Sequence, residues 1–181
     1  MNTIKKLLDF SKPVEVTGDV TLSFAKIVPS KADVLSPTAA TSVSYFLHVN
    51  VSRCTNLASA DTLGLSDAFV ILRLNNTQFA RTDVIRDSLN PVFENESFEI
   101  PILCGLSSPT LTCEVWDMDN LSVGDFLGNC TINVANLSLA PFSDDDIQLM
   151  EVTTPLKNCG KVSIPKRFPS NVDSMHKCPS V

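Results

Sequence analysis

Short runs with apolar residues at every second position recur along the chain, and helix-like spacing is nearly absent. In residues 45–51, for example, Tyr45, Leu47, Val49 and Val51 fall on one face of an extended strand. The same pattern predicts eight strands, at residues 45–51, 69–74, 78–85, 96–100, 110–116, 127–134, 146–152 and 161–164. Short strands at regular spacing, separated by turn residues, are typical of an antiparallel β-sandwich.

The segments on either side of this region differ from it in composition. Residues 18–24 alternate like one further strand, and residues 29–42 form a linker rich in Pro, Ser, Ala and Thr. After Phe168 the chain is polar and holds two prolines. The sequence therefore predicts an N-terminal extension with one extra strand (1–42), one β-sandwich domain (43–166) and a disordered tail (167–181).

The chain is acidic, with 14 Lys and Arg against 20 Asp and Glu, a net charge of −6 and a pI of about 4.8. Nucleic acid is not an expected partner, because binding phosphates requires clustered Lys and Arg. No run approaches the roughly 20 apolar residues of a membrane-spanning helix. Asp9 interrupts the apolar stretch at the N-terminus, so we expect no signal peptide and a cytoplasmic location. Cys113 falls in an apolar run, where we expect a reduced, buried thiol.

Five aspartates gather in two short segments that each lie between predicted strands. Asp61 and Asp67 belong to the first segment, and Asp117, Asp119 and Asp125 belong to the second. Carboxylates that lie close together repel one another, and a bound cation offsets that repulsion. Ca²⁺ takes six to eight oxygen ligands and tolerates irregular geometry better than Mg²⁺ does. The pattern predicts a Ca²⁺ site assembled from two loops.

A series of motifs in this part of the chain resembles the C2 domain family in order and spacing. The motifs lie at residues 56–57, 61, 64–70, 81–85, 88–94, 115–119 and 125–128. The resemblance extends over residues 45–164, about two thirds of the chain. It implies an eight-stranded antiparallel sandwich with calcium-binding loops at one end.

The resemblance also implies a set of calcium ligands, namely Asp61 and Asp67 from the first loop and Asp117, Asp119 and Asp125 from the third. All five acidic positions are retained here, whereas many C2 domains have lost some of them. Two Ca²⁺ ions would bring about +4 against the −5 of these ligands. Such ions could accept oxygens from anionic headgroups of the phosphatidylserine type, so an anionic phospholipid membrane is the expected partner.

Apolar residues accompany the acidic ones in both loops: Leu63 and Leu65 in the first, Leu121 and Val123 in the third. We expect these four side chains to contact the membrane, where burial is worth roughly 25 cal/mol per Å². The alternative is that Leu65 and one third-loop residue pack inward. Ala68 departs from the family pattern, which usually has proline there, but this change removes no ligand.

The predicted function is calcium-dependent binding to anionic membranes. Enzymatic activity is not expected, because the chain has two histidines and no nucleophile or phosphate-loop motif. Two alternatives stay open: a protein-interaction C2 domain with a structural or vestigial calcium site, and a targeting fragment of a larger protein. Arg73, Arg81 and Arg86 could bind phosphoinositides, although three arginines without a lysine run favour solvated or paired side chains.

Within the family, residues 81–85, 89–91 and 101–104 resemble the second C2 domain of copines. In that likeness, residues 18–24 resemble the closing strand of a preceding C2 domain. The chain would then be a truncated relative of copines or a lone C2 protein.

Overall fold

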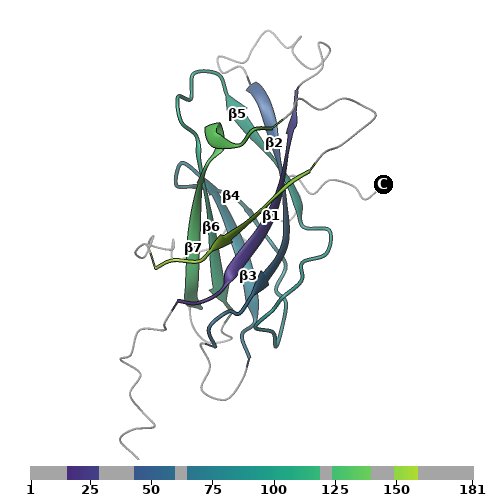
Figure 1. Ribbon diagram of the computed structural model, residues 1–181, viewed down its shortest axis with the longest axis vertical. Coiled ribbons are helices and arrows are strands. Elements are labelled where there is room, and N and C mark those ends of the chain that lie inside the picture. The colour runs from purple at the N-terminus through teal and green to yellow at the C-terminus, as the bar shows by residue number, and fades with distance from the viewer. Residues whose placement is uncertain (1–15, 29–42, 60–64, 119–123, 140–148, 159–181) are drawn as a thin grey trace, which may run out of the picture.

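Two four-stranded antiparallel sheets form the part of the chain described by the computed structural model, namely residues 16–28, 43–59, 65–118, 124–139 and 149–158 (Figure 1). The elements are β1 (Asp19–Ile27), β2 (Val43–Thr55), β3 (Ala68–Leu74), β4 (Thr77–Arg81), β5 (Ser97–Leu103), β6 (Thr110–Asp117), β7 (Asp125–Asn133), the 3-10 turn η1 (Val134–Asn136) and β8 (Met150–Pro155). The strand order is β5-β2-β1-β8 in one sheet and β4-β3-β6-β7 in the other. The predicted all-β antiparallel sandwich is therefore confirmed. No helix among these residues is long and apolar enough to cross a membrane.

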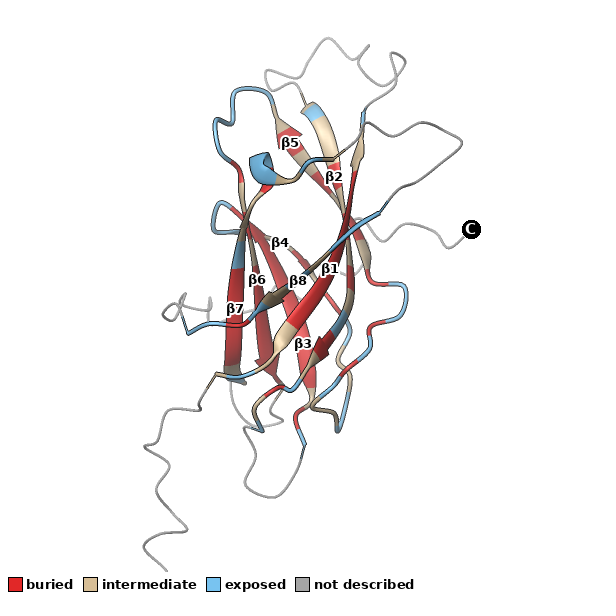
Figure 2. Ribbon diagram, viewed as in Figure 1, coloured by how far each residue is buried: buried red, intermediate tan, exposed pale blue. Residues whose placement is uncertain are grey.

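The two sheets face each other across an apolar core. Every second residue of a strand points inward, as the alternation in the sequence requires. In β1, Val20, Leu22 and Phe24 are all fully buried, and they belong to one cluster with Val70 and Leu72 of β3. Figure 2 shows the buried stretches of β1 and β3 in red. Full burial of such a side chain is worth roughly 1.5–3 kcal/mol, so this face fixes the register of both sheets.

Three cysteines lie in this core and are free: Cys54, Cys113 and Cys130. The expectation of a reduced, buried Cys113 is confirmed, since none of its surface is exposed. Burial raises the pKa of Cys54 to about 12, because the thiolate would lose its hydration. Cys113 and Cys130 lie directly opposite each other on β6 and β7. These thiols act as small apolar side chains in the core.

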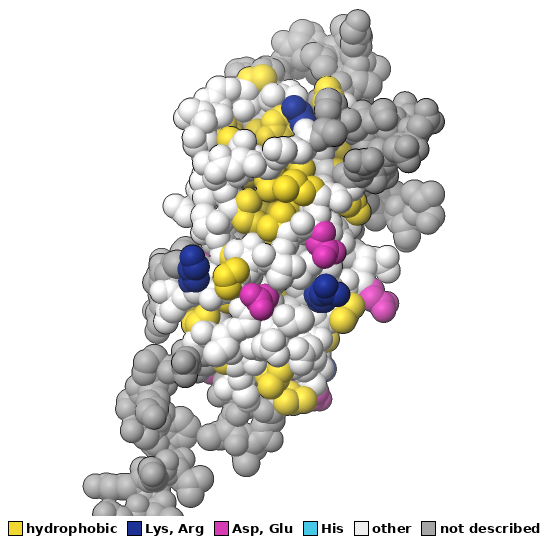
Figure 3. All heavy atoms as spheres, viewed as in Figure 1, with side chains coloured by type: hydrophobic (Ala, Val, Ile, Leu, Met, Phe, Trp, Pro, Cys, Tyr) yellow, Lys and Arg dark blue, Asp and Glu magenta, His cyan; other side chains and the backbone are white. Residues whose placement is uncertain are grey.

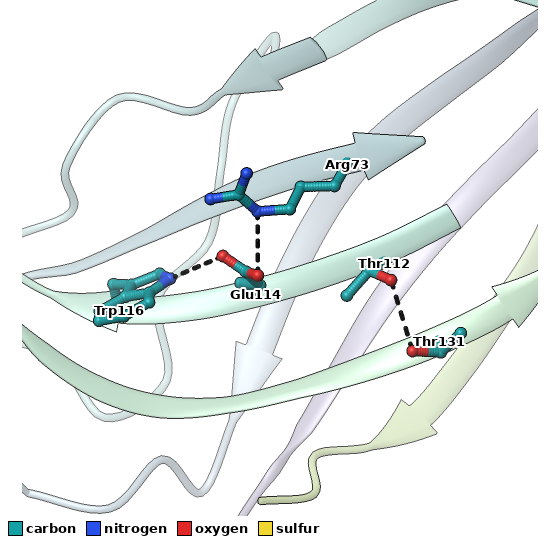
Figure 4. Close-up of polar contacts among 5 residues, drawn as sticks. All are labelled: Arg73, Thr112, Glu114, Trp116 and Thr131. Carbon is teal, nitrogen blue, oxygen red and sulfur yellow. Dashed lines mark hydrogen bonds and ion pairs between the residues drawn. The ribbon is translucent and has the colours of Figure 1, made fainter. Parts of the chain in front are cut away.

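The outer face of the second sheet carries a separate buried cluster, which is why β3 is buried along its whole length. Phe69, Ile71 and Trp116 form it. Beside them, the Arg73 Nε donates to Glu114 Oε1 at 3.0 Å, and the Trp116 indole N–H donates to Glu114 Oε2 at 3.2 Å (Figure 4). Both charged residues are almost completely buried, and their pairing offsets part of the cost of removing them from water.

Strand β1 is an integral part of the sandwich, which differs from the expectation drawn from the sequence. The sequence predicts residues 18–24 as an extra strand outside the domain, similar to the closing strand of a preceding one. Instead β1 lies between β2 and β8 and pairs with both along most of its length. The interpretation as part of a preceding domain is wrong, because the inward side chains of β1 are needed to close this core.

The end of β4 also differs from expectation. The run predicted as residues 78–85 ends at Arg81, because Thr82 turns its side chain to the backbone and its hydroxyl accepts from Val70 N–H. The Thr82 N–H still donates to the Val70 carbonyl at 2.9 Å, and further along Ile85 exchanges two backbone hydrogen bonds with Ala68. The predicted strand at 161–164, the linker at 29–42 and the tail at 167–181 lie outside the described residues.

Candidate calcium site

The described parts of the two acidic segments meet at one end of the sandwich, the lower end in Figure 1. Strands β3 and β6 pair so that Ala68 lies opposite Asp117, and β6 and β7 pair so that Asp117 lies opposite Asp125. Antiparallel partners lie about 4.5–5.5 Å apart between Cα atoms. The start of β3, the end of β6 and the start of β7 are therefore neighbours, and so are Asp67, Asp117 and Asp125.

The Asp67 backbone and the Asp117 side chain are in direct contact. The Asp67 N–H donates to Asp117 Oδ1 at 2.6 Å, and Met118 N–H donates to the Asp67 carbonyl at 2.9 Å. Asp117 is only 1% exposed, whereas Asp125 is exposed. Burying a carboxylate is costly unless hydrogen bonds or a cation compensate for the lost water. Asp117 is the most buried of the three aspartates, and the strand pairing places it between Asp67 and Asp125.

The second loop, which joins β4 to β5 and spans residues 82–96, also reaches this end. Arg86 Nη1 lies 3.7 Å from Asp67 Oδ2, and the Asp87 N–H donates to Asp67 Oδ1 at 2.9 Å. The sequence prediction placed no second-loop residue at the site. The second loop is brought to the site by the bridge between Ala68 and Ile85. No local pattern in the sequence indicates this pairing, so only the tertiary structure reveals it.

A glycine shapes the third loop. Gly124 has a φ of +85°, and a Cβ at this position would collide with the backbone carbonyl of Asp117. The chain therefore passes close to Asp117 just before it reaches Asp125, and this approach requires a residue without a side chain. In the first loop, the Ser66 hydroxyl donates to the Ala58 carbonyl at 3.1 Å and ties both ends of that loop together.

Of the predicted site residues, Asp61, Leu63, Asp119, Leu121 and Val123 lie outside the described residues. The other predicted membrane contact, Leu65, is 46% exposed, so its side chain does not pack into the core.

The donor chemistry at this end of the sandwich fits a hard cation. Asp67, Asp117 and Asp125 offer carboxylate oxygens, which Ca²⁺ and Mg²⁺ prefer over nitrogen or sulfur ligands. Within the described ranges, no three His, Cys, Asp or Glu side chains are grouped so that they could hold a metal ion. Two of the five predicted ligands, Asp61 and Asp119, lie outside those ranges. Of the predicted ligands, Asp67, Asp117 and Asp125 are described, and these three lie at the same end of the sandwich.

The three arginines considered for phosphoinositide binding are engaged in separate contacts. Arg73 pairs with Glu114, and Arg86 pairs with Asp67. Arg81 lies over the Phe69 ring, 4.1 Å from its centroid. Paired or stacked arginines do not add up to a free basic surface.

Comparison with known proteins decides the family. The sequence model of the C2 domain matches residues 46–149, more than half of the chain. This chain belongs to the C2 domain family. Its C2 domain is 31% identical over 129 residues to Synaptotagmin-4 of Arabidopsis thaliana, and 32% identical over 99 residues to the eye isozyme of protein kinase C of Drosophila melanogaster.

These alignments cover 71% and 52% of this chain but only 21% and 14% of the two relatives. An uncharacterized Schizosaccharomyces pombe protein is 38% identical over 85 residues, which are 47% of this chain and 7% of that protein. The C2 domain thus spans a small part of the curated relatives it matches.

Solved structures agree on the fold. A C2 domain of the RIM protein from Drosophila superposes with a TM-score of 0.57 at 18% identity, covering 79% of this chain and 100% of that domain. The corresponding domain of RIM2 gives a TM-score of 0.52 at 16% identity, covering 77% and 97%. At such low identity the likeness concerns the fold alone.

Proposed function

We propose that this C2 domain is a calcium-dependent binding module for anionic phospholipid membranes, with no catalytic activity of its own. One observation carries the proposal: aspartates from two loops far apart in sequence, Asp67 in the first and Asp117 and Asp125 at the third, converge at one end of the sandwich. C2 domains generally bind calcium through loops at one end of the sandwich. Membrane binding is common in the family, to which synaptotagmins and protein kinase C contribute members.

In this proposal, calcium controls membrane binding by changing the charge at the loop end of the sandwich. Without metal, the clustered carboxylates repel an anionic bilayer. On the face shown in Figure 3, the basic side chains of the described residues lie singly and form no continuous patch. Bound calcium would supply positive charge and open coordination positions for headgroup phosphate or carboxylate oxygens. Two ions would leave the five proposed ligands close to neutral. The protein's part is to hold Asp67, Asp117 and Asp125 at one end of a rigid sandwich.

Apolar side chains add to the attraction once repulsion is removed. Leu65 is exposed beside Asp67, at the end where the first loop joins β3. Leu63, Leu121 and Val123 belong to the same two loops and are proposed as further membrane contacts. Each buried apolar Å² contributes roughly 25 cal/mol, so a few leucines add a modest, headgroup-independent term.

The test is co-sedimentation with phosphatidylserine/phosphatidylcholine liposomes, in Ca²⁺ and in EGTA. We expect binding only in Ca²⁺, and loss of binding in the Asp117→Asn/Asp119→Asn variant, because each change removes a ligand charge. The control is Glu151→Gln, which removes one exposed charge from β8, a strand of the other sheet.

Equal binding in Ca²⁺ and EGTA would contradict the proposal. Absence of binding in both would favour the alternative of a protein-interaction domain with a structural calcium site. Finer assignments also belong to the proposal: a cytoplasmic protein that becomes peripheral to the membrane with calcium, and a relationship to the second C2 domain of copines. The copine likeness rests on residues 81–85, 89–91 and 101–104.

A further inference from the structure

The second loop engages both oxygens of one proposed calcium ligand. Asp67 Oδ1 accepts the Asp87 N–H at 2.9 Å, and Asp67 Oδ2 lies 3.7 Å from Arg86 Nη1. The Asp67 side chain is 22% exposed and the Arg86 side chain 72%, so the contact is at the surface of the molecule. A metal ion that uses Asp67 must therefore meet a cation that is already next to the same carboxylate.

The backbone around Arg86 is pinned to the start of β3. Ala68 and Ile85 exchange two backbone hydrogen bonds of 2.9 Å, and Ser88 N–H donates to the Ser66 carbonyl at 2.9 Å. These bonds lie on either side of Arg86 in sequence. The Arg86 backbone is thus held beside the start of β3, so its guanidinium remains within reach of Asp67.

We propose that Arg86 competes with calcium for the Asp67 carboxylate, and that the second loop thereby sets the calcium affinity of this domain. This inference rests on the proposed function. In the metal-free protein, Arg86 partly neutralises Asp67 and lowers the repulsion within the acidic cluster. When calcium binds, the guanidinium loses its ion pair with Asp67 and is repelled by the divalent cation, and both effects raise the free energy of the bound state.

Competition and an ordinary structural ion pair predict opposite changes in calcium affinity when Arg86 is replaced. Removing a stabilising structural contact should leave calcium binding unchanged or weaken it. Removing a competitor should tighten calcium binding. Exposed ion pairs are weak, but a unit charge facing a divalent ion at this range changes affinity by about three- to tenfold.

The experiment is a calorimetric calcium titration of the full chain with Arg86→Gln. We expect the dissociation constant to fall about three- to tenfold at low ionic strength, and the gain to shrink at high salt because screening weakens the competition. Lys26→Gln is the matched control, since it removes the same charge from the part of β1 that pairs with Leu47, distant from the loops. Its dissociation constant should stay within about twofold of wild type.

Each outcome bears on a different claim. An unchanged or weaker affinity of Arg86→Gln, with wild type binding calcium, overturns the competition and leaves the proposed function standing. Absence of calcium binding in wild type overturns the proposed function and the competition with it. Arg86→Lys should fall between wild type and Arg86→Gln, since it keeps the charge but loses the planar fork that matches a carboxylate.

A second readout follows the hydrogen bond itself. The amide resonance of Asp87 reports its bond to Asp67 Oδ1. We expect calcium to move this resonance in wild type, and Asp67→Asn to move it without calcium. An Asp87 resonance that ignores saturating calcium would show that the metal does not engage Asp67, and would overturn the competition.

Discussion

Gly124 shows how a single residue can control the third loop. It immediately precedes Asp125, and it combines a φ of +85° with a backbone approach that leaves no room for a Cβ. Gly105 has a similar φ of +88° but open space around the position of a Cβ. Alanine at Gly105 would therefore cost only the free energy of a strained backbone conformation. Alanine at Gly124 would cost that strain and a steric collision as well.

We predict that Gly105→Ala lowers the free energy of unfolding by about 1–2 kcal/mol, the cost of a left-handed conformation for alanine. Gly124→Ala should cost clearly more and should also weaken calcium binding, because the chain must move away from the Asp117 carbonyl. Urea unfolding and calcium titration of both variants measure these effects. An equal loss of unfolding free energy in the two variants would contradict a steric collision between residue 124 and the Asp117 carbonyl.

At the scale of elements, β1 joins the two halves of its own sheet. It pairs with β2 on one side and β8 on the other, and it supplies Val20, Leu22 and Phe24 to the core. The long connection from β1 to β2 separates these strands in sequence, so their pairing is a tertiary event. The domain that folds should therefore include β1.

We predict that a chain beginning at residue 43 does not unfold cooperatively, because the core loses three fully buried side chains. Among the described strands, β2 also loses one of its two partners, and β8 loses the strand it pairs with. A chain beginning at residue 16 keeps every described strand and serves as the control. Circular dichroism melting curves compare the two. A cooperative transition at the same temperature in both chains would show that β1 is dispensable.

For the whole molecule, binding at the loop end should stabilise all of the sandwich, because the ligands sit on the ends of strands that run through the core. Asp67 precedes β3, while Asp117 ends β6 and Asp125 begins β7. A ligand that binds only the folded state adds stability that grows with its concentration. If calcium binds as proposed, the melting temperature should therefore rise with its concentration.

We predict that calcium at a hundred times its dissociation constant adds about 2.7 kcal/mol and raises the melting temperature by roughly 5–10 °C. The Asp117→Asn variant should show little of this shift. Differential scanning calorimetry in Ca²⁺, Mg²⁺ and EGTA provides the measurement. An equal shift in Mg²⁺ would indicate a general charge effect in place of a calcium site.

The sequence by itself determined the fold class and the principal acids of the candidate site. Alternation along 45–51 and 110–116 is a local property, because successive side chains of a strand point to opposite faces, and it appears in β2 and β6. Asp117 and Asp125 could be placed together because they flank a single short connection between neighbouring strands.

Only the tertiary structure decided the contacts that join distant segments. It placed β1 inside the sheet, put Trp116 in a buried cluster on the outer face, and brought Arg86 and Asp87 to Asp67. A run of alternating residues indicates which face of a strand is apolar, but it does not indicate which other strand will pair with that strand. Those choices depend on how all the apolar faces are buried together, and that is a property of the whole chain.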